Sequence, residues 1–266
     1  MKQFEKYFIA NKDLWNKKTL IHKASSFYDL KSFRNGRSSL KAVELEELGD
    51  IKGKSILHLQ CHFGMDTLSL ARLGARVTGI DLSNEAIETA RKLNDELGLD
   101  AKFYCSNIYD LPDLLEEKFD IVFTSYGVIA WLPDLDKWAA IIVHFLKKGG
   151  TFYMAEFHPV LWMLDEHLQH VKYHYHNQEM YFAEHNGTYA DRNANIKGLE
   201  YSWNHSIGEV LNPLIQQGLR IEHFHEFSYS PFNCFSNLVK GKDGNWRVKG
   251  LENKIPMMFT VKAVKK

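Results

Sequence analysis

The stretch ILHLQCHFGMDTLSLARLGARVTGIDLS, residues 56–83, decides the fold of this 266-residue chain. It starts as an apolar run, passes through a short loop into a helical pattern, and ends in a second apolar run that Asp81 closes. This strand–loop–helix–strand order is the unit from which parallel sheets are built. Ligands of such sheets bind outside the carboxyl ends of the strands, where the loop and Asp81 would meet. We therefore expect a binding site at this place.

The same alternation of apolar runs and amphipathic stretches continues along the chain. Apolar residues at helical spacing predict helices over 84–98, 134–150 and 208–219, with a shorter helix ending near 68–74. Strands are predicted at 55–60, 76–80, 101–105, 120–125, 151–156, 220–227 and 257–265. Pro231 and a polar stretch at 240–245 separate the last two strands, which favours a terminal antiparallel hairpin. We expect an α/β fold: a Rossmann-like, mostly parallel seven-stranded sheet with helices on both faces.

The pattern divides the chain into four parts. Residues 1–50 are predicted to form an N-terminal helical cap, 51–160 the ligand-binding core, 161–205 an inserted lid, and 206–266 the rest of the core sheet. Long aperiodic insertions in compact domains are usually functional, and the aromatic content of this one argues against disorder. The aromatic residues of the cap either cover a sheet edge or close over the site; the candidates are Trp15, Phe27, Tyr28 and Phe33.

Composition restricts the class of protein. Basic and acidic residues both number 33, so the basic excess that is typical of nucleic-acid binders is missing. Cys61, Cys105 and Cys234 are few and far apart, which indicates buried free thiols rather than a disulfide framework. We find no signal-peptide pattern and no apolar run long enough to span a bilayer, so we expect a cytoplasmic protein.

The loop after the first strand bears on the kind of nucleotide. The dinucleotide fingerprint needs glycines so that the backbone can approach a pyrophosphate. Here the matching positions hold Gln60, His62 and Met65, with Gly64 nearby. Asp81 lies 17 residues (81 − 64) after Gly64, close to the spacing of about 20 expected for an acid that binds a ribose. The pattern disfavours NAD and favours a nucleoside ligand without a pyrophosphate.

The stretch resembles the class I S-adenosylmethionine-dependent methyltransferases. Their first motif reads like V-L-D-L-G-C-G-x-G, and residues 56–64 read ILHLQCHFG. His58 replaces the acidic residue of that motif, while Gln60 and His62 replace two glycines. We expect His58, within a strand, to be a hydrogen-bonded core residue rather than a catalytic one.

Four later segments match the family's other motifs in order. They are GARVTGIDLSNEAIETAR (74–91), AKFYCSNIYDLP (101–112), FDIVFTSYGVIAWLPDLDKWA (119–139) and LKKGGTFYMAEFHP (146–159). Asp81 takes the place of the ribose-binding acid, and Asn107 that of an Asp that meets the adenine amino group. The segments LQCHFGMDTLS, WNHSIGE (203–209) and EFSYSPFN (226–233) indicate a little-characterised branch of the family. The resemblance implies cofactor contacts from Gln60, Cys61, His62, Gly64, Asp66, Thr67, Asp81, Leu82, Asn107, Ile108, Ser125 and Tyr126. Asp66 and Thr67 are also expected to cap their helix.

The implied reaction is transfer of a methyl group from S-adenosylmethionine to a small-molecule acceptor. The alternatives are a non-catalytic S-adenosylmethionine-binding protein and, less favoured, an NAD-type oxidoreductase. A general base is needed only if the acceptor arrives protonated. Position nominates His158, His205 and Glu209 as catalytic residues, with Glu156 beside them, while Tyr126 and Trp131 could face the sulfonium. The histidines show no metal-site spacing, so no metal is expected. We expect a monomer or homodimer and no nucleic-acid or membrane partner.

Overall fold

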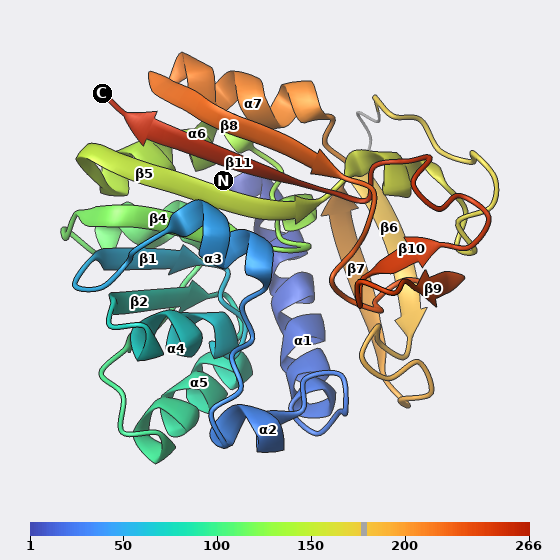
Figure 1. The fold of residues 1–266 in the computed structure, drawn as a ribbon, viewed down its shortest axis with the longest axis horizontal. Coiled ribbons are helices and arrows are strands. Elements are labelled where there is room, and N and C mark those ends of the chain that lie inside the picture. The colour runs from blue at the N-terminus through green and yellow to red at the C-terminus, as the bar shows by residue number, and fades with distance from the viewer. Residues whose placement is uncertain (177–179) are drawn as a thin grey trace.

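A central sheet organises the molecule (Figure 1). The computed structural model describes residues 1–176 and 180–266. The sheet has seven strands in the order β3-β2-β1-β4-β5-β11-β8. Its members are β1 (Ser55–Leu59), β2 (Arg76–Asp81), β3 (Lys102–Cys105), β4 (Phe119–Ser125), β5 (Leu146–Phe157), β8 (Leu219–Phe227) and β11 (Met258–Lys265). Strands β1 to β5 pair in parallel, and β11 runs antiparallel to both of its neighbours, β5 and β8. The predicted seven strands and the terminal hairpin are confirmed.

Helices cover both faces of the sheet. The strands of a buried parallel sheet carry apolar side chains on both faces, and helices pack against each of them. Leu57 and Leu59 contribute to the core beneath α6 and α7, whereas Ile56 contributes to the core beneath α3 and α4. The helices on the α6 side are η2 (Ile108–Asp113), α6 (Leu135–Phe145) and α7 (Ile207–Gln216); those on the other side are α3 (Ala42–Leu48), α4 (Met65–Arg72) and α5 (Asn84–Glu96). The remaining 3-10 turn of the core is η3 (Ile129–Trp131).

Strand β5 is longer than the sequence indicates. It begins at Leu146 instead of Thr151, since Leu146 already pairs with Phe119 of β4. The register then shifts, and Gly149 adopts a φ of 75°. The Gly-Gly turn is therefore an irregularity inside the strand rather than its starting point.

The N-terminal segment forms η1 (Lys2–Phe4), α1 (Glu5–His22) and α2 (Leu30–Arg34). Helix α1 stands across the carboxyl ends of the strands (Figure 1). Asn16 in its middle accepts a 2.7 Å hydrogen bond from Ser83, at the start of α5, and donates one of 3.0 Å to Asn84. Phe33, one of the candidate lid residues, is fully buried in the core with α4 and α5, where its ring packs beneath the Arg72 guanidinium.

The predicted lid, residues 161–205, contains ordered structure that the sequence pattern did not reveal. After η4 (Pro159–Met163), strands β6 (Met180–Asn186) and β7 (Lys197–Trp203) pair as an antiparallel hairpin. Residues 177–179 of the predicted lid lie outside the described residues. Asn11 of α1 makes two hydrogen bonds to the backbone of Tyr201, donating at 2.7 Å and accepting at 3.0 Å, so α1 and the hairpin are joined.

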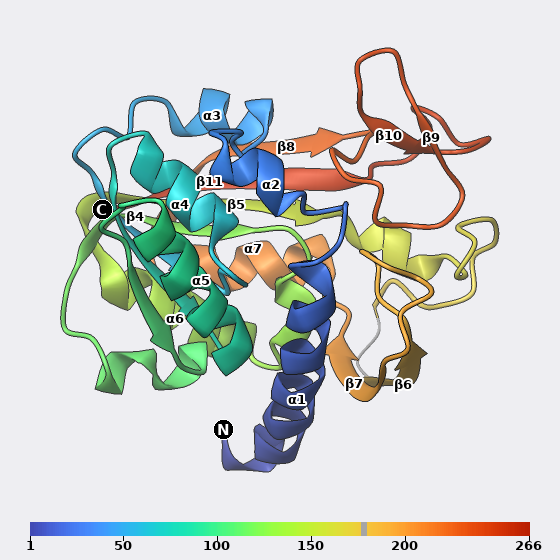
Figure 2. The same cartoon turned by 90° about the horizontal axis from the view of Figure 1, so that it is seen from below.

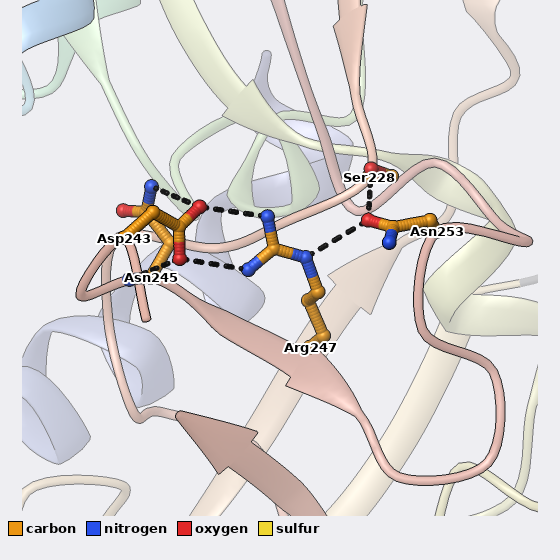
Figure 3. Close-up of polar contacts among 5 residues, drawn as sticks. All are labelled: Ser228, Asp243, Asn245, Arg247 and Asn253. Carbon is orange, nitrogen blue, oxygen red and sulfur yellow. Dashed lines mark hydrogen bonds and ion pairs between the residues drawn. The ribbon is translucent and has the colours of Figure 1, made fainter. Parts of the chain in front are cut away.

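A second hairpin, β9 (Leu238–Lys240) and β10 (Trp246–Val248), lies between β8 and β11 in the chain. Figure 2 places both hairpins beyond the carboxyl ends of the sheet. Arg247 fastens the second one: its guanidinium donates two hydrogen bonds to Asp243 and one to Asn253, which also accepts from Ser228 (Figure 3). None of the described helices has both the length and the apolar character needed to cross a bilayer.

Candidate functional site

The loop between β1 and α4 follows a path that normally requires glycine. Gln60, His62 and Gly64 all have positive φ angles, of 56°, 50° and 77°. Such a conformation costs a residue with a side chain about 1–2 kcal/mol. Gly64 has no alternative, because a Cβ there would lie 2.7 Å from the ring of Phe103 and 3.0 Å from the Cβ of Ala90. The loop therefore keeps the backbone of a glycine-rich turn although two of its glycine positions carry large side chains.

Specific contacts hold the two strained residues in place. Gln60 Nε2 donates a 2.9 Å hydrogen bond to the carbonyl of Val128, in the loop after β4. The backbone N–H of His62 donates to Asp81 Oδ2 at 2.8 Å. Its imidazole Nε2 lies 2.9 Å from Nδ1 of His22, the last residue of α1. Contacts that surround a residue on several sides are what allow a strained conformation to persist.

Asp81 ends β2 beside this loop, as predicted. Its two carboxylate oxygens accept hydrogen bonds of 2.8 Å, one from the N–H of His62 and one from the N–H of Ser83. Burial raises the pKa of Asp81 to about 6, against the lowering effect of these amide donors. A carboxylate has about four acceptor positions. Asp81 can therefore accept two more hydrogen bonds from a ligand.

A cleft of about 520 Å³ opens between α1 and the ends of β2 and β3. This volume lies within the range of small-ligand pockets. Leu82 and Asn107, both predicted cofactor contacts, line it, and the Asn107 side-chain oxygen also accepts from the N–H of Tyr109 at 3.2 Å. The wall that α1 supplies was not predicted from the sequence. That wall includes Phe8, Ile9 and Lys12, while Cys105, Ser106 and Asp110 complete the opposite side.

The start of α4 differs from its expected form. Gly64 is its N-cap, and no side chain caps the helix, so the expectation that Asp66 and Thr67 cap it is wrong. Asp66 instead accepts hydrogen bonds from Ser39, and from Ser125 at 3.1 Å. The hydroxyl of Thr67 lies 2.8 Å from Nδ1 of the buried His58, which makes His58 the hydrogen-bonded core residue that was expected.

Glu156, at the end of β5, organises the loop that follows β4. Its buried carboxylate accepts hydrogen bonds of 2.5 to 3.1 Å from four backbone N–H groups, those of Gly127, Val128, Ile129 and Phe157. Burial raises its pKa, while the amide donors lower it. With four amide donors bound, Glu156 has little capacity left to act as a base. The loop carries Tyr126, whose ring lies 4.9 Å from that of Phe232, and Trp131, whose ring lies 5.2 Å from that of Trp15.

The three residues nominated as catalytic have different surroundings. Nδ1 of buried His158 accepts from the N–H of Val160 at 3.2 Å, and its Nε2 lies 2.9 Å from a Glu226 oxygen. Nε2 of His205 donates to the carbonyl of Leu132 at 2.7 Å, which leaves Nδ1 with the lone pair. Glu209 accepts from Ser206 and completes the capping box of α7.

These surroundings do not test the catalytic assignments, which stay predictions. Burial lowers the pKa of both His158 and His205, and their carboxylate or carbonyl neighbours oppose that effect. Both histidines are therefore neutral near pH 7. Among the described residues, a backbone N–H donates to the lone-pair nitrogen of His158 but none donates to that of His205.

Helix α1 adds a buried polar and aromatic layer that has no motif in the sequence. Lys18 pairs with Glu200 at 3.3 Å, and its ammonium lies 4.9 Å from the ring of Trp15 and 5.2 Å from that of Trp131. Burial lowers the pKa of Lys18, while Glu200 raises it. His22 belongs to the same layer.

The three cysteines differ in their exposure. Cys61 is buried, Cys234 partly buried and Cys105 exposed, and all three are free thiols. The expectation of buried thiols is thus wrong for Cys105, because the end of β3 opens into the cleft. Among the described residues, no group of three His, Cys, Asp or Glu is arranged to hold a metal ion.

Comparison with known proteins gives consistent results. Residues 50–217 match a family model described as a methyltransferase domain. The chain is 28% identical over 135 residues to a ubiquinone biosynthesis O-methyltransferase of Xanthomonas euvesicatoria, covering 50% of this chain and 56% of that protein. It is 32% identical over 103 residues to the protein of that name from Alkalilimnicola ehrlichii, covering 39% and 41%. The chain thus spans about half the length of the curated relatives it matches.

Solved structures share the fold. A putative S-adenosylmethionine-dependent methyltransferase from Listeria monocytogenes superposes with a TM-score of 0.58 at 20% identity, covering 85% of this chain and all of that one. A geranyl diphosphate C-methyltransferase from Streptomyces coelicolor gives 0.55 at 16% identity, covering 85% and 79%. At these identities the likeness concerns the fold alone, and it confirms the Rossmann-like sheet.

Proposed function

The chain belongs to the methyltransferase-domain family, and we propose that it transfers the methyl group of S-adenosylmethionine to a small-molecule acceptor. The family match confirms the resemblance seen in the sequence to the class I S-adenosylmethionine-dependent methyltransferases. The observation that supports the proposed activity most strongly is the glycine-type loop of Gln60, His62 and Gly64, held against Asp81 next to a cleft.

The residues of this region fit an adenosine. Asp81 has acceptor capacity left for the two ribose hydroxyls. Leu82 and Asn107 line the adjoining cleft, and the Asn107 oxygen can accept from an adenine amino group while it holds the N–H of Tyr109. Gln60 and His62 occupy positions at which a dinucleotide-binding loop has glycine, so that its backbone can approach the pyrophosphate. This arrangement favours an adenosine with a methionine-derived tail over NAD.

The remaining predicted cofactor contacts would surround the methionine-derived tail of the cofactor. Cys61 and Gly64 belong to the loop after β1, whereas Ser125 ends β4 and Tyr126 follows it directly. Asp66 is held by Ser125. Thr67 and Ile108 are buried, so we assign them to shaping the site rather than to polar contact with the cofactor.

When bound, S-adenosylmethionine supplies an activated methyl group, so the protein's own contribution is proximity and alignment. Tyr126 and Trp131 lie in the loop held by Glu156, and their rings can attract a sulfonium by about 0.5–2 kcal/mol. For an acceptor that arrives protonated, His158, His205 and Glu209 remain the predicted bases. Replacement of His158 or His205 by alanine should slow turnover and leave cofactor affinity nearly unchanged.

We also propose the wider setting expected from the sequence: an N-terminal cap (1–50), a cofactor-binding core (51–160), a lid (161–205) and a C-terminal part (206–266). The free thiols suit a reducing compartment, which supports the cytoplasm. The hydrogen bonds between Asn11 and Tyr201 support joint action of the cap and the lid on an enclosed small acceptor, as a monomer or homodimer.

The activity is tested by incubating the protein with S-adenosylmethionine and a library of small metabolites, including phenols, amines and thiols. We expect S-adenosylhomocysteine to accumulate with a subset of acceptors, and the product to gain one methyl group by mass spectrometry. Tight binding of S-adenosylhomocysteine without its formation from any acceptor would favour a non-catalytic binding protein instead.

A further inference from the structure

Two histidines from distant parts of the chain meet above the cofactor loop. Nδ1 of His22, at the end of α1, lies 2.9 Å from Nε2 of His62 in the loop. His22 is fully buried, and Trp15 packs against both rings, with centroid distances of 6.0 and 5.3 Å. Tyr28 also contacts both, stacked on His22 at 5.3 Å and edge-on to His62 at 5.6 Å. The pair is therefore fixed on several sides.

Each ring has one nitrogen left over. His22 Nε2 and His62 Nδ1 are buried and have no hydrogen-bond partner among the described residues. A buried polar atom without a partner is costly, and in native proteins it calls for an explanation such as a ligand or a catalytic role. Both atoms belong to one hydrogen-bonded unit, and one of its two rings is carried by the loop that Asp81 holds.

The shared hydrogen bond couples the tautomers of the two rings. If His62 Nε2 carries the proton and donates it to His22, then His62 Nδ1 has a free lone pair and His22 Nε2 carries a proton. If His22 Nδ1 donates instead, both free nitrogens exchange roles. One free nitrogen is always an acceptor and the other a donor, so a proton taken up at one end can be released at the other.

The charged and titratable neighbours keep the pair neutral. Burial lowers the pKa of both histidines, that of His62 to about 3, and Lys18 acts in the same direction. Tyr28 and Tyr189, whose hydroxyls lie 2.5 Å apart, also pack against the pair, and burial raises the pKa of both. A neutral pair does not repel a sulfonium, as an imidazolium would.

We propose that His62 Nδ1 accepts the proton that a neutral methyl acceptor loses, and that His22 is the positioning residue that sets the tautomer of His62. This inference rests on the proposed function and assigns the proton acceptor to His62 in place of the predicted bases His158, His205 and Glu209. The acceptor class is one whose nucleophilic atom carries a proton at neutral pH, such as a phenol or an alcohol.

The step balances within the site. A lone pair of the acceptor oxygen forms the new O–CH₃ bond while the C–S bond breaks and its electrons stay on sulfur. The acceptor's proton goes to His62 Nδ1, and the Nε2 proton of His62 moves onto His22 Nδ1. His22 then carries a proton on both nitrogens and holds the positive charge until the product leaves and solvent takes up one proton. The positive charge lost from sulfur is carried by the proton, so the net charge of the site does not change until that proton departs.

The tautomers can be observed without any acceptor. Long-range ¹H–¹⁵N NMR spectra of the labelled protein with S-adenosylhomocysteine should show both rings neutral and protonated on Nε2 near pH 7.5. Protonation of both rings on Nδ1 would leave His62 Nδ1 without a lone pair and would overturn the proposal. In His22→Asn the fixed tautomer of His62 should be lost.

Turnover supplies the second test, with phenols as acceptors whose pKa values range from about 10 to below the assay pH. Asparagine tolerates positive φ, so His62→Asn should fold. We expect it to lower kcat/KM about 100-fold or more for the least acidic phenols, and only a few-fold for phenols that arrive ionised. His22→Asn should show the same trend with a smaller amplitude. The matched control is His223→Asn, on the exposed surface of β8, which should leave all rates unchanged.

The outcomes separate the two proposals. An equal loss of rate for every phenol in His62→Asn would indicate a structural role and overturn the proton-acceptor assignment alone. A wild-type protein that methylates no acceptor would overturn the proposed function itself. Calorimetry with S-adenosylhomocysteine on each variant verifies that cofactor binding is retained.

Discussion

Asp81 Oδ2 accepts a 2.8 Å hydrogen bond from the backbone N–H of His62, and this contact fastens the end of β2 to the loop after β1. Because His62 occupies a left-handed conformation, the bond also helps to hold a strained backbone. The same carboxylate accepts from Ser83 at the start of α5. One side chain thus sets the position of the loop, a helix start and the proposed ribose contact together.

The packing of the loop can be tested at Gly64. Gly64→Ala would place a Cβ 2.7 Å from Phe103, whereas Gly98→Ala, also at a positive φ, would meet no atom within 4 Å. Both variants incur the cost of a left-handed alanine, and overpacking adds about 1–3 kcal/mol at Gly64 alone. Urea unfolding should show that difference in the free energy of unfolding. Equal destabilisation of both variants would mean that the loop does not pack as described.

The pKa of Asp81, raised to about 6, predicts how binding depends on pH. Its ionised form accepts ribose hydroxyl bonds better, so affinity for S-adenosylhomocysteine should increase as the pH rises through about 6. The sign for stability is opposite. The folded state holds the proton more tightly than the unfolded chain, in which the carboxyl has its ordinary pKa of 3.8. This group's contribution to stability therefore decreases as the pH rises from 3.8 to about 6. Calorimetric titrations from pH 5 to 7.5 measure the first effect, and Asp81→Asn should remove it.

Glu156 should be indispensable for stability rather than for chemistry. In Glu156→Gln, one carboxylate oxygen becomes an N–H₂ group, which faces backbone N–H donors and cannot accept from them. Each hydrogen bond to a buried charge contributes about 1.5–3 kcal/mol. We expect a fall in unfolding free energy of about 2–4 kcal/mol, together with faster amide exchange at residues 127–129.

The matched control is Glu209→Gln, because a capping box accepts Gln as well as Glu. Its stability should change by less than about 0.5 kcal/mol. Turnover of this control also decides whether Glu209 is catalytic, since the substitution removes its charge and keeps its structural role.

Because α1 is hydrogen-bonded to the β6–β7 hairpin, we predict that the backbone amides of both segments are protected from hydrogen exchange together. Asn11→Ala removes both hydrogen bonds to the backbone of Tyr201. Hydrogen exchange should then accelerate in residues 5–22 and 197–203 together, by about fivefold for each kcal/mol lost. Asp13→Ala, at an exposed position of the same helix, serves as the control and should leave both segments unchanged. Acceleration in one segment alone would argue against a joint cap.

The core could be predicted from the sequence because its signals are local. Strands β1, β4, β5 and β11 carry runs of buried, mostly apolar residues. Ser83, Asp134 and Ser206 cap their helices with side chains. Asp81 and Asn107 could be placed because they follow strand ends, where topology alone brings them to one edge.

The rest depended on contacts between distant segments. The β6–β7 hairpin was missed because its strands lack regular alternation and are stabilised by α1, which lies far away in the sequence. His22 ends a helix without any motif, and only the fold brings it to His62. The capping role expected of Asp66 failed because Ser39 and Ser125 bind its carboxylate instead.

We propose above all that Asp81 and the adjoining loop bind an adenosine without a pyrophosphate. Calorimetry at pH 7.5 with S-adenosylhomocysteine and with NADH tests it directly, on the wild-type protein, Asp81→Asn, and the exposed control Asp95→Asn of α5. We predict that S-adenosylhomocysteine binds to the wild type and the control, at least about tenfold more weakly to Asp81→Asn, and that NADH does not bind. Binding of NADH, or equal affinity of all three proteins for S-adenosylhomocysteine, would contradict the account.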